Sequence, residues 1–129
     1  MKLFVAEPGW RDVQALWEGG GLLACSWVGY AEVRSALAAA SRAGRMSARR
    51  LDAALNELEG RWSSLATIEV DDMIARGAGL LAGRHALRAL DAIHLASALR
   101  LEDPELVVVS WDERLRQAAL DEGIAVAPA

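Results

Sequence analysis

The sequence predicts an α/β domain in which a parallel sheet is covered by helices on both faces. Three observations lead to this prediction. Short apolar runs, too brief for helices, alternate along the chain with longer segments of helical periodicity. The runs are continuously apolar, which is typical of strands buried on both faces. The length of 129 residues and the 53% of hydrophobic residues suit one globular domain, and we expect residues 1–129 to form it.

Strands are expected where short apolar runs stand between turn signals. Three glycines at 19–21 separate the first run from a preceding helix, expected at 10–18. The valine-rich run before Ser110 is the clearest strand signal in the chain. In order, the expected strands are 22–25, 65–70, 106–109 and 124–126.

Most of the later helices are expected to begin after a side chain that accepts a hydrogen bond from the first turn. For the last helix, Ser110 and Glu113 match a capping box with Ser110 as the cap. Pro104 breaks the helix before it. The expected helices are 27 to about 40 after Ser26, 48 to about 60 after Ser47, 72 to about 83 after Asp71, 89–101 and 113–120.

Composition argues against several classes of protein. Fourteen basic residues stand against 18 acidic ones, so any contact with nucleic acid has to be local. A single lysine leaves no P-loop, and one cysteine with two histidines cannot form a structural zinc site. The sequence shows neither a membrane-spanning stretch nor the pattern of a signal peptide, and we therefore expect a cytoplasmic protein.

Glu32 is the first candidate site residue. It lies near the start of the helix expected after Ser26, and its neighbours three and four positions away are small or apolar. We therefore expect its carboxylate to face open space rather than a partner on the helix surface. The alternative is an ordinary solvated glutamate, favoured by the dipole at the helix N-terminus.

Asp91 is the more specific candidate, because it lies on a helix that is otherwise almost wholly apolar. Asp91, His94 and Ser97 recur every third residue and form one polar stripe. A buried carboxylate requires a cation or a metal as its partner. The alternative is a structural role, in which Asp91 caps the helix or pairs with Arg88 or Arg84. His94 is expected to be a core histidine bonded to Asp91 or to a backbone carbonyl.

Asp112 follows the strand expected at 106–109, at the carboxyl end where open α/β sheets bind their ligands. Ser110 is expected to orient it. An aspartate in a first helical turn is also favourable without any function.

A basic cluster leaves two interpretations open. Four arginines surround the turn between the helices expected at 27–40 and 48–60. In one interpretation they bind phosphates, and in the other they form a solvated face. They are Arg42, Arg45, Arg49 and Arg50.

Four segments carry a resemblance to a known family: KLFVAEPG at 2–9, YAEVRSAL at 30–37, LRALDAIHLASAL at 87–99 and VVVSWDERL at 107–115. In this order they resemble PIN-domain proteins, and above all the VapC-type toxins of bacterial toxin–antitoxin pairs. The resemblance implies a parallel-sheet fold, an endoribonuclease dependent on Mg²⁺ or Mn²⁺, and an antitoxin that blocks it. By motif, Glu32, Asp91 and Asp112 match three of the four acidic positions of the family.

The resemblance implies roles for these residues and for the partner. Asp91 is expected to be the principal metal ligand, with Glu32 and Asp112 binding the metal directly or through water. Trp10 and Trp17 are candidate anchors for an antitoxin segment, and a homodimer is expected.

The resemblance also bears on the start of the chain. The family opens with a strand and an aspartate placed before the segment that begins at Lys2. We therefore expect the central first strand to be missing, with roughly ten residues upstream of Met1 and a gap between the strands at 22–25 and 106–109. A protein of this fold that binds without cleaving is the competing hypothesis.

Overall fold

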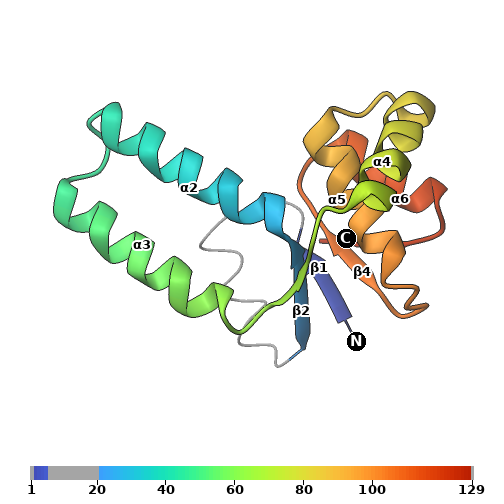
Figure 1. Cartoon of the computed structure of the whole chain (residues 1–129), viewed down its shortest axis with the longest axis horizontal. Coiled ribbons are helices and arrows are strands. Elements are labelled where there is room, and N and C mark those ends of the chain that lie inside the picture. Colours follow the sequence, from blue (N-terminus) through green and yellow to red (C-terminus); the bar gives the residue numbers. More distant parts are fainter. Residues whose placement is uncertain (1, 6–20, 129) are drawn as a thin grey trace.

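A computed structural model describes residues 2–5 and 21–128 of the chain (Figure 1). Five strands form one sheet in the order β3-β2-β1-β4-β5, and every neighbouring pair is parallel. The strands are β1 (Lys2–Val5), β2 (Leu22–Ser26), β3 (Ala66–Ile68), β4 (Val107–Val109) and β5 (Ala125–Ala127). The predicted α/β class and the parallel sheet are thereby confirmed.

The expected gap in the centre of the sheet is wrong. Strand β1 lies between β2 and β4, with Leu3 opposite Leu23 and Phe4 opposite Val108. Backbone N–H and C=O groups inside a sheet need hydrogen-bond partners, and a strand in this position supplies them to both neighbours. The segment Lys2–Val5, for which the sequence analysis predicted no strand, therefore holds the central place.

The described helices match their predicted positions to within about two residues. They are α2 (Trp27–Arg42), α3 (Ala48–Trp62), α4 (Asp72–His85), α5 (Ala89–Arg100) and α6 (Glu113–Asp121). Ser26, Ser47 and Asp71 accept hydrogen bonds from the first turns of α2, α3 and α4, as predicted. The helix expected at 10–18, with Trp10 and Trp17, lies outside the described residues. Among the helices that the structure describes, none combines the length and the apolar character needed to cross a membrane.

The capping box predicted at the start of α6 is wrong by two residues. Asp112 is the cap, and its Oδ1 accepts a hydrogen bond from the backbone N–H of Leu115 at 2.9 Å. Ser110 instead accepts a hydrogen bond from the backbone N–H of Asp112 at 3.1 Å. An aspartate next to the helix satisfies the free N–H groups of the first turn, so the more distant serine is not needed for this purpose.

Two apolar cores hold the helices against the sheet. In Figure 1, α4, α5 and α6 lie together on one side of the strands, where Leu95, Val108 and Leu115 are among the buried residues. Helices α2 and α3 extend away on the other side as an antiparallel pair. The second core lies at the base of this pair and contains Cys25 and Trp62. Burial raises the pKa of the Cys25 thiol to about 12.

Candidate active site

The parallel sheet places two candidate carboxylates near its carboxyl edge. Helix α2, which carries Glu32, begins directly after β2, and Asp112 follows β4 and caps α6. Because β2 and β4 both pair in parallel with β1, their carboxyl ends lie along the same edge. Asp91 comes from a different element, the first turn of α5.

Arg88 joins two of the three candidate carboxylates. Its Nε lies 3.1 Å from Oδ2 of Asp91, and its Nη2 lies 3.5 Å from Oδ2 of Asp112. The Asp91 side chain is only 11% exposed, whereas that of Arg88 is 76% exposed. The alternative that Asp91 pairs with Arg88 is thus confirmed, while Asp91 does not cap α5. The same ion pairs bring Asp91 and Asp112 to one cation position.

The two oxygens of Asp112 have different partners. Oδ1 caps α6, and Oδ2 faces Arg88. Ser110 is fully buried and holds Asp112 through the backbone N–H rather than through the carboxylate. The Ser110 carbonyl in turn accepts a hydrogen bond from Arg116. The cap and this backbone contact leave Oδ2 free to face Arg88, which also pairs with Asp91.

Glu32 has a partner, contrary to the expectation that it faces open space. Its Oε1 lies 2.5 Å from Nε2 of His94, and its side chain is 31% exposed. The sequence analysis expected His94 to bond to Asp91 or to a backbone carbonyl. For Nε2 of His94 this expectation is wrong, because its partner is Glu32. The polar stripe itself is confirmed, because Asp91, His94 and Ser97 are all buried. Glu32 and His94 are 62 residues apart, so no local pattern could indicate this contact.

A cavity of about 330 Å³ opens beside the two aspartates. Its lining residues are Leu87, Arg88, Asp91, Asp112, Glu113 and Arg114. The cavity therefore combines carboxylate oxygens, which are the ligands that Mg²⁺ and Mn²⁺ prefer, with guanidinium groups suited to phosphate. Glu32 is not among the lining residues.

The donor set of Asp91 and Asp112 fits a hard divalent cation. Their Oδ2 atoms already converge on one positive group, the Arg88 guanidinium. Within the part of the chain that the structure describes, no three His, Cys, Asp or Glu side chains are grouped as ligands of one metal ion. A common site for all three carboxylates stays a prediction, because Glu32 is bonded to His94.

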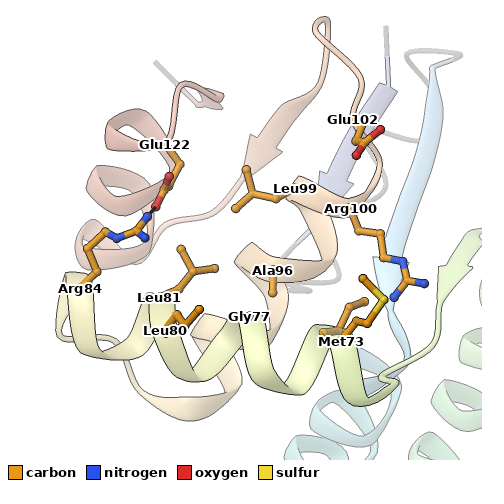
Figure 2. Close-up of a pocket in the computed structure, with 11 residues that line it drawn as sticks. Met73, Gly77, Leu80, Leu81, Arg84, Ala96, Leu99, Arg100, Glu102 and Glu122 are labelled. Carbon is orange, nitrogen blue, oxygen red and sulfur yellow. Dashed lines mark hydrogen bonds and ion pairs between the residues drawn. The ribbon is translucent and has the colours of Figure 1, made fainter.

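A larger cavity of about 540 Å³ lies elsewhere, beside α4 and α5 (Figure 2). Its walls are largely apolar and include Leu80, Leu81 and Leu99. Figure 2 shows Arg84 directed toward Glu122, with which it forms an ion pair. None of the three predicted site residues lines this cavity, so the smaller cavity at the aspartates is the better candidate for chemistry.

Comparisons with known proteins identify the family of the chain. A model of the PIN domain matches residues 1–120. Ribonuclease VapC45 and Ribonuclease VapC49, from two strains of Mycobacterium tuberculosis, are each 43% identical to the chain over 129 residues. These matches cover the whole chain and 90% of each relative.

Solved structures show the same fold. PAE2754 from Pyrobaculum aerophilum has a TM-score of 0.73 at 19% identity, with 98% of this chain and 89% of that chain covered. A toxin–antitoxin complex from Klebsiella pneumoniae has a TM-score of 0.63 at 20% identity, with 99% and 97% covered. FitAcB from Neisseria gonorrhoeae has a TM-score of 0.65 at 19% identity, with the same coverage.

Proposed function

We propose that this chain, which belongs to the PIN domain family, is a metal-dependent endoribonuclease and the toxin of a VapBC-type toxin–antitoxin pair. The observation that carries the proposal is the convergence of Asp91 and Asp112 on one cation position beside an open cavity. The 43% identity to two proteins named as ribonucleases, over the whole chain, supports it. We treat residues 1–129 as one PIN-like domain.

The proposed metal ligands are Asp91, Asp112 and Glu32, with Asp91 as the principal one. Two carboxylates 4 Å apart repel each other by about 4 kcal/mol at an effective dielectric of 20, and a divalent cation bound between them would replace this repulsion by attraction. Mg²⁺ or Mn²⁺ would orient a water molecule for attack on a phosphodiester and neutralise charge on the leaving oxygen.

The surrounding residues would hold these ligands in place. Leu115 fixes one oxygen of Asp112 through its backbone N–H and leaves the other for the cation. His94 holds the carboxylate of Glu32. Such contacts around the ligands restrict their orientation before the cation binds.

The proposed substrate is single-stranded or looped RNA, because the major groove of an A-form duplex is too deep and narrow for side chains to read the bases. Arg88 and Arg114 line the cavity and would contact phosphate groups next to the scissile bond.

The proposed protein partner is an antitoxin. The Klebsiella pneumoniae structure, which shares the fold, is a toxin–antitoxin complex. The suggested anchors Trp10 and Trp17 lie outside the described residues and remain a prediction. A homodimer and a cytoplasmic location also remain predictions.

RNA cleavage by the purified chain tests the proposal. We expect a labelled single-stranded RNA to be cleaved with Mg²⁺ or Mn²⁺ and to stay intact with EDTA. Asp91→Asn should reduce the rate by more than the roughly 10–100-fold that loss of an outer partner of a metal ligand costs. Asp52→Asn, at an exposed aspartate on α3, is the matched control and should leave the rate unchanged.

Two results would contradict the proposal in different ways. Cleavage that persists in EDTA or in Asp91→Asn would show that the metal role is misassigned. RNA binding without any cleavage would support a catalytically inactive PIN-fold binding module.

A further inference from the structure

The turn between α2 and α3 carries the densest basic cluster in the described part of the chain. Residues 33–51 contain five arginines and no aspartate or glutamate, although the whole chain has a net charge of −4. Four of these arginines surround the turn, and all four are exposed: Arg42, Arg45, Arg49 and Arg50. We call these four residues the arginine tip. Figure 1 shows that the two helices project from the sheet and that this turn is at their far end.

The arginine tip differs from the other arginines of the same helices. Arg34 and Arg61 lie nearer the sheet and form ion pairs with Glu59 and Glu57. Among the ion pairs of the described residues, none involves an arginine of the tip. The positive charge of the tip is therefore not neutralised within this part of the protein.

Two arginines of the tip are placed unfavourably for helix stability, whereas Arg42 lies in the last turn of α2, where a positive charge is favourable. The first turn of α3 contains Arg49 and Arg50 and no acidic residue. The N-terminus of a helix has a partial positive charge, so arginines there repel it while aspartate or glutamate would stabilise it. The helix dipole and the arginines together attract an anion.

The turn that carries the arginines is well defined. Gly44 has a φ of +74°, which favours glycine. Arg45 donates its backbone N–H to Ala40, and Arg50 donates its own to Ser47. The arginines are thus attached to a backbone held by hydrogen bonds on both sides of the turn.

We propose that the arginine tip binds the phosphate backbone of RNA at a site separate from the carboxylates. The proposal rests on the proposed ribonuclease function, since it assumes an RNA substrate. Arg42 lies ten residues after Glu32 on α2, or about 15 Å further along the helix axis. A single strand that follows α2 contacts the tip at one point and enters the candidate active site at another.

The chemistry of the tip favours RNA over an acidic protein partner. Guanidinium groups bind phosphate through paired hydrogen bonds. Protein interfaces also contain arginine, but they combine it with large apolar or aromatic anchors at a desolvated centre. None of the large apolar side chains that are exposed in the described residues belongs to the tip. Phosphate contacts without base contacts give binding that is independent of sequence.

RNA binding measured in EDTA tests the proposal without cleavage. The affinity for a fluorescent single-stranded RNA is measured by anisotropy between about 50 and 200 mM salt. Each phosphate contact of a single strand contributes about 0.7 to the slope of log affinity against log salt. We expect Arg45→Gln to reduce the slope by about 0.7, and the double variant Arg45→Gln, Arg49→Gln by about 1.4.

Arg76→Gln is the matched control, because Arg76 is exposed on α4 and forms none of the described ion pairs. It should leave the slope unchanged. A wild-type slope in the double variant, or an equal loss in Arg76→Gln, would overturn the proposal. A third result would also overturn the proposal: the double variant keeps its RNA binding but no longer binds a glutamate-rich peptide. The tip would then bind a protein partner.

The two proposals fail separately. Wild-type cleavage of RNA together with unchanged binding by the tip variants would overturn only the role of the tip. Binding that depends on the tip, without cleavage in Mg²⁺, would overturn only the nuclease. If the wild-type chain binds no RNA in EDTA, the proposed RNA binding by the tip is overturned. The proposed nuclease activity is still tested by the cleavage assay in Mg²⁺.

Discussion

At the scale of single residues, Arg88 has the most informative position in the candidate site. It is a cation with a largely exposed side chain, and it lies where the two aspartates converge. Only the arginine end of these pairs is exposed, and ion pairs screened by solvent contribute about 0–1 kcal/mol, so a divalent ion with oxygen ligands can displace the Arg88 side chain. A metal ion at the proposed site would therefore compete with Arg88 for the same two carboxylates.

This competition predicts that Arg88→Gln binds Mn²⁺ more tightly than the wild type. An ion pair of up to about 1 kcal/mol corresponds to a gain of roughly twofold to fivefold in affinity, measurable by titration calorimetry. Arg114→Gln is the control, because Arg114 lines the same cavity and forms none of the described ion pairs. Equal affinity in Arg88→Gln and Arg114→Gln would show that only the overall charge matters.

Gly29 is a second residue whose identity follows from packing. A Cβ atom at this position would lie 2.6 Å from the buried Sγ of Cys25. Overpacking of this kind costs about 1–3 kcal/mol, so Gly29→Ala should lower the free energy of unfolding in urea by that amount. The cost should shrink in a Cys25→Ala background, which lacks the sulfur atom. An unchanged cost there would mean that another contact excludes the methyl group.

At the scale of elements, the sequence predicts helices better than strands. The caps Ser26, Ser47 and Asp71 are local signals, and each was placed correctly. Strand β1 has no such signal, because its four residues acquire their conformation from pairing with β2 and β4. Parallel pairing joins segments distant in sequence, so the central place of this four-residue run in the sheet cannot be assigned from its own composition.

The end of α4 provides a prediction in which one substitution has opposite effects at two positions. Ala86 follows the helix with a φ of 54°, a conformation that costs an L-residue about 1–2 kcal/mol. Ala86→Gly should therefore raise the free energy of unfolding by about 0.5–1 kcal/mol after the entropy of glycine is counted. Ala75→Gly, at an exposed position in the first turn of α4, should lower it, by at most the roughly 1 kcal/mol that glycine costs in a helix interior.

Urea unfolding of the two variants checks this prediction. If both glycines destabilise the protein to the same extent, the conformation described at Ala86 does not carry the expected strain.

At the scale of the whole molecule, the sequence predicts which elements supply the site but not how the site is connected. The placement of Asp112 after β4 and of Asp91 on a buried helix could be predicted from apolar patterns. The contact between Glu32 and His94 could not, because it depends on how α2 packs against α5. Ion pairs between elements depend on tertiary packing. They leave no local pattern in a single sequence and cannot be predicted from it.

The central claim is that Asp91 and Asp112 form one divalent metal site, which Glu32 completes. A crystal structure of the full chain soaked with Mn²⁺, with the anomalous signal of manganese recorded, tests this claim most directly. We predict one peak between the carboxylates of Asp91 and Asp112, with Arg88 displaced and Glu32 coordinated directly or through water. A manganese peak elsewhere, or none with Arg88 still joining the two aspartates, would contradict the claim.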